Sequence, residues 1–424
     1  MQEAFIHFVW KHQYFDKANL VATDGTMLNV ITPGFYNTDA GPDFKESKVI
    51  IDELEWRGSI EIHHRSSDWM AHKHDHDKAY DNVILHVVWR HDKEVVRHDG
   101  TQIPTLELSA RVTPKLINGY KTLVNSLNAV PCAHQLPRVD EFTVNSMLEK
   151  MTVERLEDKA RAVIHLHGKV GQDWEAAAFH LLCRNFGFKT NVDQFARLAE
   201  LIPTKLIVKY SDNLVLLEAL LFGQAGFLEH NSKDEYQSLL LKEYQFLRHK
   251  YDLHDPMSVF QWKFMRLRPS NFPTLRIAQL AAVLHHRQGL FSRIKEVPDT
   301  GDLSTLLAVQ VSDYWKMHYR FGSEAKKEVP ALGKSSIQNI GINTVAPLMV
   351  AYGKYVDQQL FTDRAINILE ALNPEGNKIT KLWGSLGVKA NSAFKTQGMI
   401  QLYNNYCARK RCLNCGIGTK ILYA

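Results

Sequence analysis

The hydrophobic pattern of the chain changes between residues 112 and 140, and this change constrains the fold more than any other feature. Before it, short apolar segments have the alternation and composition of strands. After it, apolar residues recur at helical spacing, and prolines and glycines fall mostly between the segments. We therefore expect an α/β (or α+β) domain at 1–112, a linker at 113–140 and an α-helical domain at 141–424.

The first region has an order of elements that can be read from its pattern. The expected strands lie at 27–31, 44–51, 57–64, 83–89 and 102–108. Asp52-Glu53 separates the second strand from the third, as in a hairpin, and the apolar run at 83–89 is typical of a central strand. A short amphipathic helix is expected at the N-terminus. Another is expected over 68–80, which contains no Gly or Pro and starts at the capping residue Asp68.

The second region is expected to be built from helices. Segments with helical spacing lie at 142–166, 173–186, 192–201, 213–227, 234–251, 275–288, 305–320, 343–358 and 364–372. The chain is 424 residues long, with 45% hydrophobic and 23% charged residues, which is ordinary globular usage. It has no apolar run of membrane-spanning length, no signal-peptide pattern and only five cysteines. These features predict a reduced, cytoplasmic protein without a membrane partner.

Charge is divided unevenly along the chain. Residues 1–112 contain 12 Lys and Arg against 18 Asp and Glu, whereas the remainder contains 39 against 28. Residues 376–424 contain eight Lys and Arg and no acidic residue. A basic body joined to an acidic one is typical of a protein with a polyanionic partner such as nucleic acid. A solvated basic face is the alternative.

Two carboxylates and a histidine form the main candidate site. Asp43 stands at the mouth of one expected strand, and Glu61 and His63 lie two apart on the next. Residues two apart on a strand share a face, so Glu61 and His63 point the same way. Asp43, Glu61 and the Ile62 carbonyl would form a hard oxygen site for Mg²⁺ or Mn²⁺. Such a metal activates water against a phosphodiester, and His63 could take the proton.

Pro42-Asp43 followed by Glu61-Ile62-His63 resembles the PD-(D/E)xK nuclease superfamily. The resemblance implies a restriction-endonuclease-like αβββαβ core over residues 1–112 and nuclease activity. It also implies a role for Glu3, because the first helix of that fold often carries an acidic residue. His63 stands where the superfamily has Lys. It could replace that Lys as base, join the metal, or mark a site that binds without cutting.

Histidines and acidic residues in the segment after Glu61 form a second group of candidates. If residues 68–80 are helical, His72 and His76 are four apart and share a face, which would make half a zinc site. Asp68 and Asp77 could orient a metal-bound water or contact phosphate. We expect His86, inside an apolar strand, to be a core residue, and His74 to be solvated.

Three of the five cysteines lie close together near the C-terminus, as Cys407-x₄-Cys412-x₂-Cys415. In a reduced compartment this spacing suggests Zn²⁺ or an iron–sulfur cluster, with Cys132 as the fourth ligand or His134 in its place. Ordinary cysteines near a flexible basic tail are the alternative. Cys183 is expected to be a buried structural thiol.

Basic residues in two segments are candidates for contact with nucleic acid. Residues 261–276 interleave aromatic side chains with cations, which can stack on bases and neutralise phosphates. A second basic run lies inside the cysteine group. The candidate cations are Lys263, Arg266, Arg268, Arg276, Arg409, Lys410 and Arg411. A connector with core aromatics and solvated arginines is the alternative for the first segment.

Several longer segments are similar to a bacterial family with no assigned activity, domain of unknown function 2851. They include NTDAGPDF, GSIEIHHRSSDW, RLRPSNFP and the CARKRCLNC tail. The function expected from the residues is a divalent-metal-dependent phosphodiesterase, a nuclease acting on DNA or RNA. Two alternatives are a nucleic-acid-binding protein that does not cleave, and a zinc-dependent hydrolase of small molecules acting through His72 and His76.

Overall fold

The computed structural model describes residues 2–228, 232–286, 289–298 and 300–423. Two compact units make up the chain. The first unit consists of residues 1–147 and 403–424, and the second consists of residues 148–402. This division differs from the expected ranges, because the predicted linker and the C-terminal cysteine segment both belong to the first unit.

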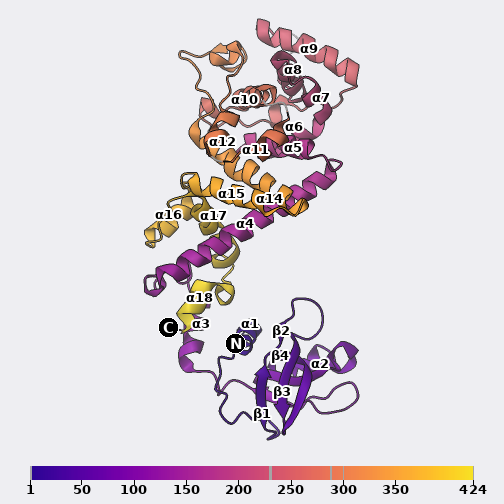
Figure 1. The fold of residues 1–424 in the computed structure, drawn as a ribbon, viewed down its shortest axis with the longest axis vertical. Coiled ribbons are helices and arrows are strands. Elements are labelled where there is room, and N and C mark those ends of the chain that lie inside the picture. The colour runs from indigo at the N-terminus through magenta and orange to yellow at the C-terminus, as the bar shows by residue number, and fades with distance from the viewer. Residues whose placement is uncertain (1, 229–231, 287–288, 299, 424) are drawn as a thin grey trace. The chain divides into compact units, whose positions relative to one another are not determined.

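The first unit contains a six-stranded mixed sheet in the order β1-β3-β4-β5-β6, with β2 paired to β3 (Figure 1). Its strands are β1 (Leu28–Thr32), β2 (Phe35–Tyr36), β3 (Phe44–Ile51), β4 (Leu54–Arg65), β5 (Val83–Arg90) and β6 (Thr105–Glu107). β1, β3 and β4 are antiparallel neighbours, whereas β4, β5 and β6 run parallel. The mixed α/β character expected from the sequence is confirmed, and β2 is an addition to it.

The pattern of β3, β4 and β5 explains why they form this sheet. Ile60 and Ile62 of β4 are fully buried, and β5 is buried along most of its length, as its apolar composition requires. Asp52 and Glu53 join β3 to β4 with φ of 46° and 70°. A two-residue turn in which both residues have positive φ matches the right-handed twist of the strands that it joins. The predicted hairpin is thus present.

The longer helices that belong wholly to the first unit come from both ends of its sequence. They are α1 (Glu3–Lys11), α3 (Pro114–Asn125) and α18 (Gly416–Tyr423). The apolar face of α1 is fully buried, including Phe5 and Trp10, and α1 packs on β4. At the C-terminus, Leu422 contacts Gly119 of α3, and the ring of Tyr423 lies 4.2 Å from that of Tyr14. These contacts make the last residues part of the first unit.

The helix predicted over residues 68–80 is wrong. Only α2 (Asp68–Ala71) is α-helical, and two 3₁₀ turns follow at His74–His76 and Lys78–Tyr80. Lys73 has a left-handed φ of 63°, which ends the helix, and Asp77 caps the second turn by accepting from the Ala79 amide. The buried packing of Trp69 against His74 and Tyr80 stabilises this irregular path over a continuous helix.

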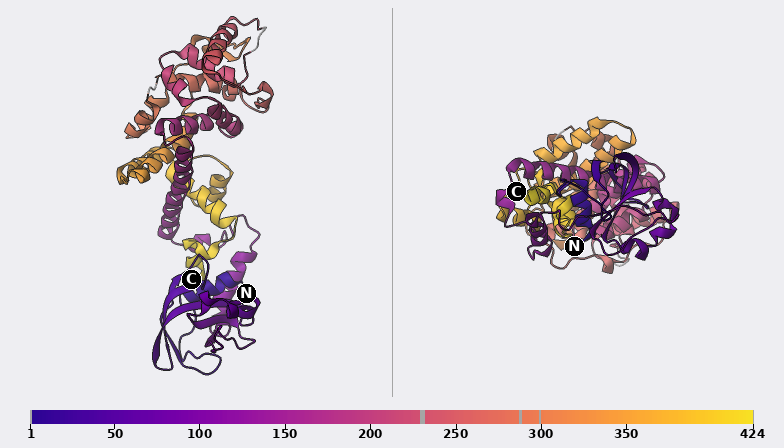
Figure 2. Two further views of the ribbon diagram at one scale, coloured as in Figure 1. Left: turned by 90° about the vertical axis from the view of Figure 1, so that its right-hand side faces the viewer. Right: turned by 90° about the horizontal axis from the view of Figure 1, so that it is seen from below.

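The second unit is mostly helical. α4 (Glu141–Lys169) is one continuous helix that begins in the first unit and ends in the second (Figure 2). The other helices are α5 (Trp174–Phe186), α6 (Val192–Leu201), α7 (Thr204–Lys209), α8 (Leu214–Gln224), α9 (Glu235–Tyr251), α10 (Pro273–His286), α11 (Leu290–Glu296), α12 (Thr300–Leu307), α13 (Lys334–Ile340), α14 (Ala346–Tyr355), α15 (Gln359–Ala371), α16 (Lys378–Ser385) and α17 (Ala393–Gln401). Most of them contribute apolar side chains to one large core. Among the helices of the described residues, none has the length and apolarity needed to cross a bilayer.

One predicted helix of this unit, at 305–320, is mostly wrong. α12 ends at Leu307, and a short hairpin of β7 (His318–Arg320) and β8 (Ser323–Glu324) occupies the end of that segment. The buried Trp315 stacks on Phe222 and donates a hydrogen bond to Glu218. These contacts of Trp315 fix another backbone path, although the local spacing of apolar residues favours a helix. The helix predicted over 275–288 extends at its end onto residues outside those described.

Candidate metal centre

Asp43 and Glu61 lie side by side on adjacent strands. Asp43 directly precedes β3, and the pairing of Phe44 with Ile60 places it next to Glu61 of β4. Glu61 Oε2 accepts a hydrogen bond from the Asp43 amide at 3.1 Å, and Asp43 Oδ2 accepts one from the Ile62 amide at 3.0 Å. The structure therefore places the two residues on neighbouring strands, where each carboxylate accepts from the backbone of the other strand.

Helix α1 adds a carboxylate and an imidazole to Asp43. His7 Nε2 lies 3.1 Å from Asp43 Oδ2 and 3.6 Å from Glu3 Oε1. One ligand atom from each of these three residues lies within 4.8 Å of those of the other two. His7 Nε2 is buried and has no hydrogen-bond partner, although carboxylates surround it. We call Glu3, His7 and Asp43 the Asp43 subsite.

The sequence predicted Glu3 as a site residue but not His7. The signal was present, because residues four apart on a helix lie on one face and the segment was expected to be helical. His7 would have been identified by asking which side chain shares the face of Glu3.

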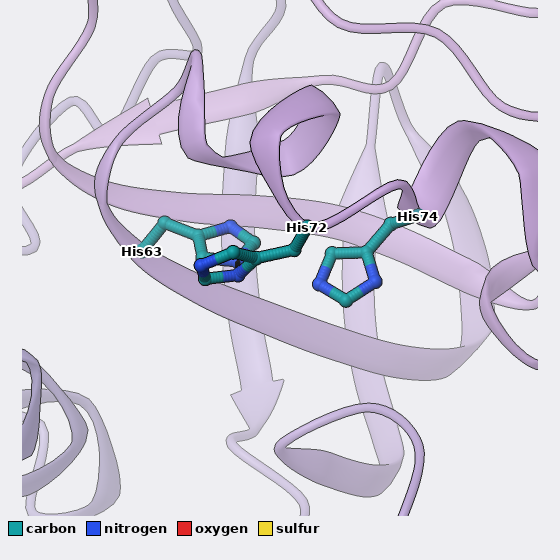
Figure 3. A group of neighbouring side chains, drawn as sticks. All are labelled: His63, His72 and His74. Atoms are coloured by element: carbon teal, nitrogen blue, oxygen red, sulfur yellow. Dashed lines mark hydrogen bonds between the residues drawn. The ribbon is translucent and has the colours of Figure 1, made fainter.

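His63 is the centre of a second group. Its Nε2 lies 3.1 Å from His72 Nδ1 and 3.6 Å from Glu61 Oε1, and its Nδ1 lies 2.8 Å from His86 Nε2. His74 Nε2 lies 3.4 Å from the same Glu61 oxygen. Figure 3 shows the rings of His63, His72 and His74 gathered together, and one ring nitrogen of each lies within 4.8 Å of those of the others. We call these three residues the histidine cluster.

Three elements position the histidine cluster. Glu61 and His63 share a face of β4, and Glu61 pairs in register with His86 of β5. His72 follows the last residue of α2, and the left-handed Lys73 turns the chain so that His74 returns to the cluster. The ring of Tyr80 stacks on His74 with centroids 3.8 Å apart. The cluster therefore forms because the chain turns at Lys73, where a continuous helix was expected.

Burial shifts the pKa values of Glu61, His63 and His86 in the direction that favours their neutral forms. Burial, followed by the negative charge of Asp43, raises the pKa of Glu61 to about 9. Burial and the neighbouring imidazoles of His86, His74 and His72 hold the pKa of His63 far below its usual value. Burial, followed by the imidazoles of His74 and His91, lowers the pKa of His86 to about 3. Neutral imidazoles can bind a metal ion without losing a proton, and the protonated carboxyl would release its proton on binding one.

The remaining candidates from this segment do not join either group. Asp68 accepts from the Arg65 amide at 2.9 Å, and Asp77 caps a turn. His76 is exposed and contacts Asp75. The expected pair of His72 and His76 on one helix is therefore wrong. His74, expected to be solvated, is buried in the cluster, whereas His86 is buried as expected.

A family model described as "Protein of unknown function (DUF2851)" matches residues 3–378 of the chain. The chain belongs to the DUF2851 family. The matched range includes the Asp43 subsite, Glu61, the histidine cluster and Cys132, and it ends before Cys407. No curated protein and no solved structure matches the chain.

The five cysteines of this DUF2851 chain are buried, and none of them forms a disulfide. Burial and the neighbouring thiols raise the pKa of Cys132 to about 12 and that of Cys412 to about 11, and Cys407 and Cys415 are among the interacting thiols. These four cysteines therefore gather in one region of the first unit. Among the described residues, no ligand group with atoms within 4.8 Å of one another includes a cysteine. Cys183 is fully buried in the second unit, as expected.

The candidate cations for nucleic acid fall into two classes. Lys263, Arg266, Arg268 and the run from Arg409 to Arg411 are exposed. Arg276 is different, because it is buried and stacks on Phe188 at 4.3 Å. Its guanidinium donates to Gln279, Asn271 and Ser336, and it lines a cavity of about 280 Å³. Arg276 is therefore an internal residue and not part of an exposed basic surface.

Proposed function

We propose that the protein is a divalent-metal-dependent phosphodiesterase that acts on nucleic acid. The observation that supports this proposal best is the position of Asp43, directly before β3, beside Glu61 within β4, with His63 of β4 next to Glu61. Asp43, Glu61 and the Ile62 carbonyl would hold Mg²⁺ or Mn²⁺. Glu3 and His7 complete the surroundings of that ion.

The order of elements also supports this proposal. α1 is followed by the antiparallel strands β1, β3 and β4, then by α2, and then by β5 parallel to β4. This order resembles the αβββαβ order of the PD-(D/E)xK superfamily, with β2 and β6 as additions. Asp43 directly precedes the second of these main strands, and Glu61 and His63 lie on the third.

The roles of the residues follow from their surroundings. A bound divalent cation would polarise the phosphodiester and lower the pKa of the attacking water. Of the roles expected for His63, that of a further metal ligand fits its environment best, because its Nε2 faces Glu61 and other imidazoles. The exposed cations Lys263, Arg266, Arg268 and Arg409–Arg411 would contact the phosphate backbone.

The test is nicking of supercoiled plasmid by the full chain in Mg²⁺ or Mn²⁺. Glu61→Gln removes a metal-binding charge without changing shape, and we expect nicking to fall by at least about 100-fold, since even changes outside the ligand shell cost about 10–100-fold. Glu55→Gln is the matched control, because Glu55 lies on the same strand but is exposed and pairs with Arg57. Nicking that is equal in both variants would reject the proposal.

The alternative without cleavage makes a different prediction. Wild-type protein would then retain plasmid or oligonucleotide without nicking it in any divalent cation. Retention would also survive Asp43→Ala and Glu61→Ala. This result would assign the protein as a nucleic-acid-binding module with a degenerate site.

We also propose that Cys132, Cys407, Cys412 and Cys415 bind Zn²⁺ or an iron–sulfur cluster. The burial of these four thiols, and their influence on one another's ionisation, support this proposal. Thiolates are the ligands, so binding would remove the protons that burial retains. Such a site would be separate from the carboxylates, and its role would be structural.

A further inference from the structure

We propose that His63, His72, His74 and Glu61 form a second metal subsite, which takes Zn²⁺ beside the Asp43 subsite. This zinc site differs from the pair of His72 and His76 expected from a helix, since His74 replaces His76 and β4 supplies two of the ligands. Zinc binding stands independently of the proposed cleavage. Only the consequence for catalysis rests on the proposed function.

Three of the separations between the proposed ligand atoms are close to those around a tetrahedral zinc ion. Zinc bonds to imidazole nitrogen and carboxylate oxygen are about 2.0–2.1 Å, so ligand atoms around one ion lie roughly 3.3–3.4 Å apart. The separations from His63 Nε2 are 3.1 Å to His72 Nδ1 and 3.6 Å to Glu61 Oε1, and that from His74 Nε2 to Glu61 Oε1 is 3.4 Å. Small movements of the imidazole rings would allow these ligand atoms to surround one zinc ion.

The ligand type selects zinc over magnesium. Imidazole nitrogen suits zinc and other transition metals, whereas Mg²⁺ prefers oxygen ligands. Three imidazoles in one group therefore differ in preference from the Asp43 subsite, which offers mainly carboxylate oxygen. His72 is exposed, so the cluster has a path to solvent through which a metal ion can enter.

Neighbouring groups would hold the ligands in place. When His63 Nε2 binds the ion, its Nδ1–H donates to His86 Nε2 at 2.8 Å. Trp69 and Tyr80 pack against the ring of His74, and the Trp69 indole donates to the Val96 carbonyl. These contacts limit the reorganisation that binding requires.

Glu61 would connect the two subsites. Its Oε1 faces His63 and His74, while its Oε2 accepts from the Asp43 amide. A carboxylate with one oxygen on each side can bridge two ions, and paired ions stabilise both the attacking and the leaving oxygen of a phosphodiester. If the proposed function holds, the enzyme would use one zinc and one Mg²⁺ or Mn²⁺ ion.

The test is metal binding by the full chain, stripped of metal and titrated with Zn²⁺ against a chromophoric chelator. We expect His72→Ala and His74→Ala each to weaken one equivalent of zinc by more than about 100-fold, since outer partners alone contribute about 10–100-fold. His76→Ala is the matched control, because His76 is exposed and outside the cluster, and it should bind as wild type does. His72 is also exposed, so its variant should fold normally.

Co²⁺ gives an independent readout. A four-coordinate site of nitrogen and oxygen ligands should give visible absorption that is lost in His72→Ala and kept in His76→Ala. Equal zinc affinity and stoichiometry in wild type, His72→Ala and His74→Ala would overturn the proposal. Zinc binding without nicking would overturn the proposed function alone, and Mg²⁺-dependent nicking without zinc binding at the cluster would overturn this inference alone.

Discussion

Glu218 of α8 is buried in the second unit, where its Oε2 accepts from Tyr236 Oη at 2.7 Å and Trp315 Nε1 at 3.1 Å. Burial raises the pKa of Glu218 to about 7, and these donors oppose the rise. Glu61 accepts from the Asp43 amide but has a second carboxylate beside it, and its pKa rises to about 9. Glu218 thus has protein donors on one of its two oxygens, whereas the carboxyl of Glu61 has the charge of Asp43 beside it.

Glu218→Gln should change how stability depends on pH. The carboxyl binds its proton more tightly in the folded state than in the unfolded state, so wild type loses stability as pH rises from about 4.5 to about 7. Gln lacks this titration. Each pKa unit corresponds to about 1.4 kcal/mol, so the variant should gain a few kcal/mol relative to wild type between pH 5 and 8.

Urea unfolding at several pH values measures this difference. Glu200→Gln serves as the control, because Glu200 is exposed on α6 and pairs with Arg197. Its stability should follow that of wild type at each pH. Parallel curves for wild type and Glu218→Gln would contradict the assignment of a protonated Glu218.

At the scale of elements, helices with unbroken apolar spacing were predicted well and irregular segments were not. α6 has the predicted bounds, and so does β3. The segments at 68–80 and 305–320 have local helical spacing, but buried aromatic residues such as Trp69 and Trp315 fix other backbone paths there. Local propensity is worth little per residue, so the burial of one large aromatic side chain outweighs it.

The end of α8 depends on a close approach at Gly226. This residue has φ of 78°, and a Cβ there would lie 1.9 Å from the Met257 carbonyl oxygen. Gly226→Ala should cost the roughly 1–2 kcal/mol of a left-handed residue and, in addition, the displacement of that backbone. Urea unfolding at one pH measures the loss.

Gly171→Ala separates these two costs. Gly171 has nearly the same φ, 77°, but nothing lies within 4 Å of the added Cβ. Its variant should lose only about 1–2 kcal/mol. Equal losses at the two positions would show that the contact with Met257 contributes nothing.

At the scale of the molecule, the first unit contains both ends of the chain. Residues 403–423 belong to the first unit although the whole second unit precedes them in the sequence. They carry three of the four cysteines of the first unit. Gly418 lies so close to the Cys412 carbonyl that a Cβ would approach within 2.3 Å of it. A metal on these cysteines would join residue 132 to the C-terminal segment and stabilise the closure of a long chain loop.

The cysteine site can be tested by metal analysis of protein purified without oxygen. Wild type should contain zinc or iron that is lost in Cys412→Ala and Cys415→Ala, and these variants should unfold more readily because metal binding stabilises the folded state. Cys183→Ala is the control, since Cys183 is buried in the second unit and should not affect metal content. Unchanged metal content in the first two variants would reject the site.

Local features of this protein could be predicted from its sequence. Strand alternation placed Glu61 and His63 on one face, and the predicted hairpin placed Asp43 beside Glu61. These predictions succeeded because periodicity and strand adjacency are properties of short segments. The change of pattern near residue 112 also marked the mixed and helical parts.

Only the tertiary structure decided which distant side chains meet. His7 comes from a helix 36 residues before Asp43, and His74 reaches the cluster because the chain bends at Lys73. Arginine is usually exposed, but Arg276 is buried beside Phe188. Such contacts depend on how elements pack and on which irregular turns that packing stabilises, and a local pattern carries no information on either.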